Sequence, residues 1–67
     1  MTEISKREIE ILNLISLGCS TKDIANKLHV SNETVKSHRK NLFKKLSAIN
    51  SANLIREAFH QDIIKPS

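Results

Sequence analysis

A spacing of apolar and polar residues recurs along the chain and predicts where helices begin. In each occurrence an apolar residue precedes Ser or Asn, a polar residue follows three positions later, and a second apolar residue comes directly after it. The Ser or Asn caps the unpaired N–H groups of a helix, and the two apolar residues contact each other across the first turn. The spacing occurs in four segments: Ile4–Ile9, Cys19–Ile24, Val30–Val35 and Ile49–Leu54.

Four helix starts predict an all-α fold with four helices, over about residues 6–17, 21–28, 32–46 and 51–61. The first start is the strongest, because Glu8 stands where it completes a capping box with Ser5. Gly18 follows the first helix, at a position where a left-handed residue ends many helices. We expect residues 1–67 to form one domain, with its core in 4–61 and a loose tail, including Pro66, in 62–67.

The 3.6-residue period of these helices predicts which side chains form the core. Apolar residues recur at three- and four-residue intervals on one side of each helix. The predicted core residues are Ile4, Ile9, Ile11, Leu12, Ile15, Ile24, Ala25, Leu28, Val30, Val35, Leu42, Phe43, Leu46, Leu54, Ile55, Ala58 and Phe59. The fourth helix is apolar over about half its circumference, more than one core contact requires. We expect the excess to form a dimer seam; closure of a small core is the alternative.

Length and composition exclude several classes of protein. The chain has 67 residues and a single cysteine, so it forms no internal disulfide. No apolar run approaches the ~18 residues of a membrane span, and the N-terminus lacks the charged-then-apolar layout of a signal peptide. These features predict a cytoplasmic protein that does not enter membranes. So short a chain has little room for walls around a pocket, which argues against an enzyme.

Positive charge is concentrated in the middle of the chain. Residues 34–56 carry six Lys or Arg and no Asp or Glu, whereas residues 1–33 and 57–67 each have a net charge of −1. A block of one sign favours a polyanionic partner such as nucleic acid. A solvated surface is the alternative, although solvated surfaces usually mix both signs.

The second and third predicted helices have the layout of a helix-turn-helix. A three-residue connection, His29-Val30-Ser31, joins a helix of about eight residues to the next one, and turns of this length fold two helices roughly 90–120° apart. Ala25 is small where the two helices approach each other. His29 replaces the glycine that is usual in this turn, and His adopts a positive φ more readily than most residues.

The third helix presents a basic surface opposite its apolar side. Lys36, Lys40 and Lys44 follow one another at four-residue intervals, beside Glu33 and Ser37. Lysines at this spacing repel one another by a few tenths of a kcal/mol per pair in a free helix. The repulsion is offset if the lysines meet phosphates or guanine edges, so the pattern favours DNA binding.

Several runs of residues match one known family. They are Ser5–Glu8, Gly18–Ser20, Asp23–Ala25, Leu28, Val30–Ser31, Thr34–His38 and Lys45–Leu46, and the match covers about residues 4–60. The block Val30-Ser31-x-x-Thr34-Val35-Lys36-x-His38 is the most specific of them. On these residues the chain resembles the LuxR-type (GerE/FixJ/NarL-like) helix-turn-helix DNA-binding domain.

The resemblance implies a four-helix domain that binds pseudo-palindromic promoter DNA as a homodimer, with the third helix in the major groove. The residues implied at bases are Lys36, Ser37 and Lys40. Those implied at phosphates are Thr34, His38, Lys44 and Lys45. The implied dimer seam lies on the fourth helix, at Leu54, Ile55 and Ala58. The domain is then the output half of a response regulator or a stand-alone GerE-like regulator, and RNA polymerase is a further candidate partner.

Each of these roles has a structural alternative. For Lys36 and Lys40 the alternative is an ordinary solvated helix face, and for Ser37 it is a small residue that permits close approach. His38 lies at the edge of the core stripe, where it orients the helix equally well. Thr34 helps to start the third helix whether or not it contacts a phosphate.

Other functions have weaker support in the sequence. Cys19 and the three histidines lack ligand-like spacing, so we expect no metal and no cofactor. No His stands at a motif distance from Cys19, and no acid–base pair is grouped, so we expect no catalysis. The alternatives to a regulator are a helical protein-interaction adaptor with a basic docking face and a promoter-binding module like region 4 of sigma factors.

Overall fold

The computed structural model describes residues 3–64, and this part of the chain contains four helices and no strand. They are α1 (Lys6–Ser16), α2 (Thr21–Leu28), α3 (Asn32–Lys45) and α4 (Ser51–His60). The all-α, four-helix fold predicted from the sequence is confirmed, and every helix begins at the predicted residue. Three of the helices end one residue earlier than predicted.

Side-chain caps explain why the starts were predictable. In each helix a Ser or Asn side-chain oxygen accepts a hydrogen bond from the backbone N–H three residues later. The pairs are Ser5–Glu8, Ser20–Asp23 and Ser31–Thr34, each at 3.1 Å, and Asn50–Asn53 at 2.8 Å. In turn, the carboxylates of Glu8 and Asp23 accept hydrogen bonds from the backbone N–H groups of Ser5 and Ser20, which completes two capping boxes.

Each of the four helices is followed, one or two positions after its last residue, by a residue in the left-handed region of backbone space. These residues are Gly18, His29, Ser47 and Asp62, with φ between 52° and 87°. After each of them, the next backbone N–H donates to the carbonyl five residues earlier, at 2.9–3.0 Å. This hydrogen bond satisfies a carbonyl that the helix leaves unpaired. The positive φ of His29 was predicted, whereas those of Ser47 and Asp62 were not.

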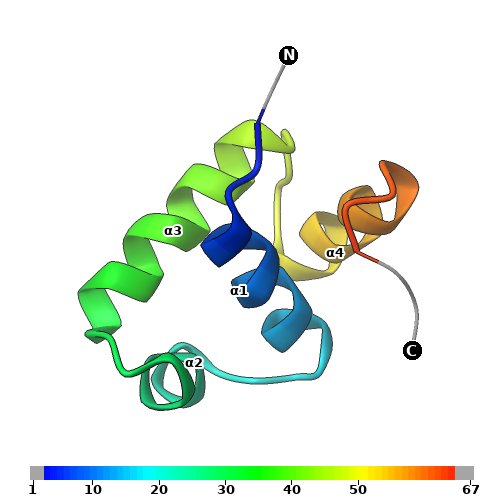
Figure 1. The fold of residues 1–67 in the computed structure, drawn as a ribbon. Helices are drawn as coiled ribbons and strands as arrows, with labels where there is room; N and C mark the ends of the chain where they lie inside the picture. Colours follow the sequence, from blue (N-terminus) through cyan, green and yellow to red (C-terminus); the bar gives the residue numbers. More distant parts are fainter. Residues whose placement is uncertain (1–2, 65–67) are drawn as a thin grey trace.

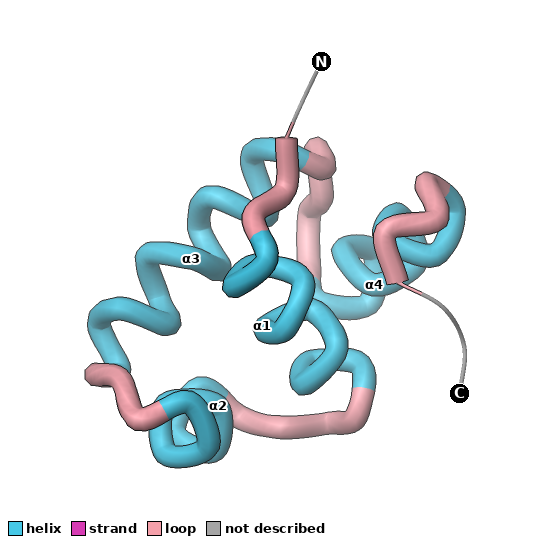
Figure 2. The backbone as a smooth tube through the Cα atoms, in the orientation of Figure 1, coloured by secondary structure: helices cyan, strands magenta, loops and turns pink. Residues whose placement is uncertain are grey.

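Helix α1 lies in the centre of the molecule, between α3 on one side and α4 on the other (Figure 1). It contacts all three other helices, and α2 packs directly against α3. Short connections join the helices, and the segment before α1 passes close to the C-terminal end of α3 (Figure 2). This arrangement leaves the side of α3 that faces away from α1 uncovered.

The core takes side chains from every helix. The buried apolar residues are Ile11, Leu12, Ile24, Ala25, Val35, Leu42, Leu46, Leu54, Ala58 and Ile64. All of them except Ile64 were predicted from the helical period. Most of the remaining predicted residues lie half-buried against this cluster, on the flanks of the helices.

Two expectations about the C-terminal region are corrected. Phe59, predicted in the core, is 36% exposed, because it lies on the side of α4 that faces away from α1. Residues 62–64, predicted as part of a loose tail, fold back onto the domain. The left-handed Asp62 reverses the chain, the N–H of Ile63 donates to the carbonyl of Ala58 at 2.9 Å, and Ile64 is only 4% exposed. Pro66 lies outside the described residues.

Candidate nucleic-acid interface

Burial of one side of α3 determines which of its side chains face solvent. Val35 and Leu42 are completely buried, and Leu46 caps the helix from within the core. Because an α-helix repeats every 3.6 residues, the side chains opposite this stripe point outward. They are Glu33, Lys36, Ser37, Lys40, Asn41 and Lys44, all exposed, and we call them the outer face of α3.

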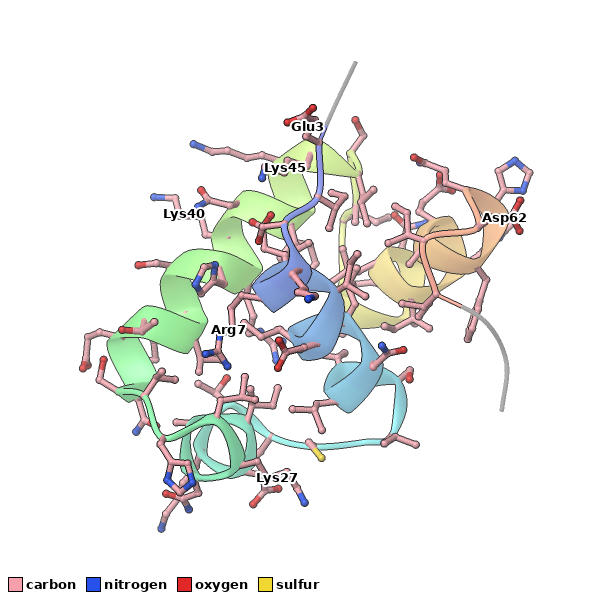
Figure 3. All side chains as sticks on the ribbon, viewed as in Figure 1. Glu3, Arg7, Lys27, Lys40, Lys45 and Asp62 are labelled. Atoms are coloured by element: carbon pink, nitrogen blue, oxygen red, sulfur yellow. The ribbon has the colours of Figure 1, made fainter. Side chains whose placement is uncertain are left out.

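The outer face of α3 is predominantly basic and lies away from the other helices. It carries three lysines and one acid, and Figure 3 shows Lys40 extending away from α1 on the free side of the helix. The two side chains between them, Ser37 and Asn41, add hydrogen-bonding groups without charge. Such a surface matches a polyanion that also displays donors and acceptors.

The turn between α2 and α3 holds this face in a definite orientation. His29 adopts φ 57° and ψ 45°, which lets the chain reverse directly after α2. Val30 packs against the core, and Ser31 caps α3. Ala25 is buried, and its single methyl group leaves room for the two helices to approach. The sequence-predicted helix-turn-helix is therefore present.

The residues predicted at DNA bases lie together on the outer face of α3. Lys36, Ser37 and Lys40 are exposed and fall within its first nine residues. Of the residues predicted at phosphates, Lys44 lies on the same face, two turns further along than Lys36. Thr34 is exposed at the helix start, where its hydroxyl lies 2.9 Å from the Ser31 hydroxyl.

His38 and Lys45 are placed differently from their neighbours. His38 is half-buried beside the core stripe, three residues after Val35 and four before Leu42. Lys45 turns back toward α1, where its Nζ donates to Glu8 Oε1 at 2.7 Å, near the segment that carries Glu3 (Figure 3). Glu8 is only 3% exposed. The position of Lys45 differs from the one expected of a phosphate-binding side chain, since its ammonium group is held in an ion pair within the domain.

Two hydrogen bonds offset the cost of burying the Glu8 carboxylate. Its Oε1 accepts from Lys45 and, at 3.0 Å, from the backbone N–H of Ser5. Burial raises the pKa of Glu8, but the hydrogen bonds from Lys45 and Ser5 and the Lys45 charge outweigh it, so its pKa lies below the ordinary 4.5. The ionised form is therefore favoured in the folded domain.

This lowered pKa makes stability depend on pH. A carboxyl whose folded-state pKa is depressed adds stability that is complete above its unfolded-state pKa of about 4.3 and is lost as the pH falls through the folded-state value. Glu8→Gln is therefore expected to flatten the fall in unfolding free energy below about pH 4.3. Urea unfolding at a series of pH values measures the slope. Glu10 is an exposed carboxyl on the same helix, so Glu10→Gln should keep the wild-type slope. Equal slopes for the wild type, Glu8→Gln and Glu10→Gln would contradict a lowered pKa for Glu8.

Arg39 is a structural residue that the sequence did not single out. Its Nη2 donates to Ser51 Oγ at 3.1 Å and so joins the middle of α3 to the first residue of α4. In the sequence Arg39 is one basic residue among six, twelve positions from its partner. No spacing rule connects the two, because the contact depends on how α3 and α4 sit around α1.

The predicted dimer seam is corrected in part. Leu54 and Ala58 are both 0% exposed, because they face α1 and belong to the core of the chain itself. Ile55, the third predicted residue, is half-buried. Helical geometry puts another set of side chains on the side of α4 that faces away from the core. They are Ala52, Arg56 and Phe59, which are exposed, with Ile55 at the edge, where it is half-buried and also packs against the core; together we call them the outer face of α4.

Within residues 3–64, no helix has both the length and the apolar character needed to cross a membrane. The same part of the chain has no group of three His, Cys, Asp or Glu side chains arranged to hold a metal ion. Cys19 is half-buried and packs against the core.

A short helix, a tight turn and a second helix with a basic free face are the parts of a helix-turn-helix DNA-binding domain. Comparison with known proteins gives the same class. The GerE family model, described as bacterial regulatory proteins of the luxR family, matches residues 2–58. The chain belongs to this family and is a DNA-binding domain of the kind found in transcriptional regulators, not an enzyme.

Curated relatives share sequence over almost the whole chain. The transcriptional regulatory protein MctR of Rhizobium johnstonii is 44% identical over 61 residues, which are 91% of this chain and 28% of MctR. The oxygen regulatory protein NreC of Staphylococcus epidermidis is 40% identical over 62 residues, covering 92% of this chain and 28% of NreC. The chain thus spans less than a third of the length of these two regulators.

Solved structures show the same fold. The response regulator ChrA of a heme-sensing two-component system aligns with a TM-score of 0.91 and 38% identity, over 96% of this chain and 32% of ChrA. The transcription factor GerE aligns at 0.83 and 34%, over 88% of both chains. Vibrio cholerae VqmA, a LuxR-type receptor described as a dimer, aligns at 0.86 and 27%, over 94% of this chain and 28% of VqmA.

Proposed function

We propose that this domain binds specific sites in double-stranded DNA by inserting the outer face of α3 into the major groove. The observation that carries the proposal is an exposed row of lysines on a helix whose opposite side is fully buried. B-DNA's major groove is about 12 Å wide and admits one α-helix with its side chains. The free side of α3 is the part of this domain that fits it, because the other side lies against α1 and α2.

Position along α3 divides the roles of its side chains. In a helix-turn-helix, residues near the start of the second helix reach base edges, and residues further along meet the backbone. Lys36 and Lys40 are therefore proposed to donate to guanine O6 and N7, with Ser37 between them at a base edge. Lys44, further along the outer face, is proposed at a phosphate, and so are Thr34 and His38, which lie off the outer face. Lys45 contributes through its charge near the same end of the helix.

The lysines of the outer face give a direct test. Lys36→Ala and Lys40→Ala are each expected to weaken binding to a selected site by about 1–3 kcal/mol, roughly 5- to 150-fold, because each removes a base contact. Lys22→Ala, an exposed lysine of α2, is the matched control and should bind nearly as the wild type does. The measurement is selection from random double-stranded DNA, followed by titration of the selected site with each variant.

Two results would count against this assignment. If both lysine variants bound the selected site as tightly as the wild type, α3 would not be the recognition helix. If the wild type enriched no sequence and its binding depended only on salt, the basic surface would serve as a docking face for acidic partners instead. The wild-type slope of log affinity against log salt should be about −0.9 for each phosphate neutralised.

We further propose that two copies of the domain bind a two-fold symmetric site together and that the outer face of α4 forms the contact between them. This face combines three apolar side chains, Ala52, Ile55 and Phe59, in a helix whose other side is already buried. VqmA, which shares the fold, is described as a dimer. A seam built on α4 leaves α3 of each copy free to enter the groove.

The domain is proposed to be the output part of a signal-responsive regulator. It corresponds to 28% of MctR and of NreC and to 32% of the response regulator ChrA. A stand-alone regulator is the second possibility, since 88% of GerE aligns with this chain. Promoter binding of either kind brings RNA polymerase within reach as a partner.

A further inference from the structure

One acidic side chain interrupts the basic outer face of α3. Glu33 is the only Asp or Glu in this helix, and it is exposed in the first turn. Among residues 3–64, its carboxylate has no hydrogen-bond or ion-pair partner, in contrast to Glu8, Glu10 and Asp23. A free carboxylate on a surface that approaches DNA repels phosphates, so its presence there requires an explanation.

Glu33 lies on the same stripe as the proposed base-contacting residues. It precedes Lys36, Ser37 and Lys40 by three, four and seven residues, the intervals that place side chains on one side of a helix. With a rise of 1.5 Å per residue, Glu33 stands about 4.5–6 Å along the axis from Lys36 and Ser37. That is between one and two base-pair steps of about 3.4 Å. The carboxylate is therefore positioned to meet a base pair beside those that the lysines meet.

The chemistry of the groove limits what a carboxylate can bind. An ionised carboxylate only accepts hydrogen bonds, and the donors in the major groove are cytosine N4 and adenine N6. Adenine sets the acceptor N7 beside its N6 donor, which repels a second acceptor and suits the amides of Asn or Gln. Cytosine presents N4 without such a neighbour on its own edge, so it is the base that a carboxylate selects.

A local explanation predicts a different result. An acid in the first turn stabilises a helix through the dipole, and this effect does not depend on DNA sequence. In α3 the first turn is already capped, since the Ser31 hydroxyl accepts from the Thr34 N–H at 3.1 Å and lies 2.9 Å from the Thr34 hydroxyl. Stabilisation through the helix dipole would be the same on any side of the first turn, so it does not explain why Glu33 lies on the same side of α3 as Lys36 and Lys40.

We propose that Glu33 is a specificity-determining residue that accepts a hydrogen bond from cytosine N4, next to the guanines bound by Lys36 and Lys40. The inference rests on the proposed function and adds a chemical class of base pair to it. The preferred half-site then contains a cytosine one or two steps from a guanine on the strand that α3 contacts. The negative charge also rejects sites with an acceptor at that position.

The test compares the sites selected from random double-stranded DNA by the wild type, Glu33→Gln and Glu33→Ala at one salt concentration. The wild type is expected to select cytosine at one position of each half-site, and replacing that cytosine should weaken binding about 5- to 150-fold. Glu33→Ala should lose the preference at this position alone and keep the guanines. Glu33→Gln, which has nearly the same shape but a neutral amide, should shift the preference toward adenine.

Controls separate this role from charge and folding. Glu10→Gln removes the same charge from α1, where Glu10 pairs with Arg7 at 3.6 Å, and should select the wild-type motif. Circular dichroism confirms that every variant is folded. A wild-type motif that Glu33→Ala selects unchanged, even with a uniform gain or loss of affinity, overturns the inference and leaves the proposed function intact. A wild type that selects no motif overturns both.

Discussion

Leu54→Glu is expected to unfold the domain, whereas Ala52→Glu, two residues away on the same helix, is expected to leave it folded. Leu54 is completely buried against α1. The substitution removes about 1.5–3 kcal/mol of apolar burial and brings an unpaired charge into the core, at several kcal/mol more. The sum is comparable to the whole stability of a domain this small, at roughly 0.05–0.15 kcal/mol per residue.

Ala52 differs because it lies on the outer face of α4, in its first turn. A glutamate there meets solvent and the positive end of the helix dipole, so stability should hardly change. If the outer face of α4 is the dimer seam, Ala52→Glu puts two like charges together and should abolish binding to a two-fold site while single half-site binding persists. This matched pair separates a role in folding from a role in association.

Far-UV circular dichroism with thermal unfolding measures the first effect. Sedimentation and binding to one or two half-sites measure the second. If Leu54→Glu folded and failed only to dimerise, Leu54 would belong to the dimer seam and its place in the core would be contradicted. A folded Ala52→Glu chain that still occupies two half-sites together would remove the outer face of α4 from the seam.

Lys45→Ala is expected to lower the unfolding free energy by about 1–3 kcal/mol, because it leaves the buried Glu8 carboxylate without its charged donor. The partial exposure of Lys45 and the remaining Ser5 hydrogen bond keep the loss below that of a fully buried pair. Lys44→Ala removes the same side chain one residue earlier, from the outer face of α3. Its effect on stability should stay within about 0.5 kcal/mol.

The same two variants should rank in the opposite order when DNA binding is measured. Lys44→Ala is expected to reduce the salt slope by about 1, as loss of one phosphate contact does, and Lys45→Ala to reduce it less. Urea unfolding and salt titrations on a selected site give the two readouts. Equal stability of the two variants would show that the Glu8–Lys45 pair contributes nothing measurable.

Contacts at three points determine how α3 is presented. The His29–Ser31 turn joins its start to α2, Arg39 donates to Ser51 in its middle, and Lys45 pairs with Glu8 at its end. A helix held at both ends and in the middle keeps the outer face of α3 in one orientation. Recognition side chains on such a support need little further ordering when they bind.

Local features of the sequence predicted helix starts better than helix ends. Each start depends on a hydrogen bond between residues three apart, so the residue types alone indicate it. Gly18 and His29 signal the ends of α1 and α2 through their tolerance of positive φ. Ser47 gives no such signal. Asp tolerates a positive φ as His does, but nothing else in the sequence marks Asp62 as a helix end, because the chain turns there only where the following residue, Ile63, packs against the core.

The sequence by itself determined the four helices, the buried sides of α1, α2 and α3, and the family, because caps, helical period and motif spacing are local properties. It also placed Lys36, Ser37 and Lys40 on one helix face. Only the tertiary structure decided that Lys45 pairs with Glu8, 37 positions away, and that the buried side of α4 is the one with Leu54 and Ala58. The 3.6-residue period shows which side chains share a face of a helix, but it does not show what each face packs against. When a helix is apolar over half its circumference, packing against the rest of the chain makes that choice.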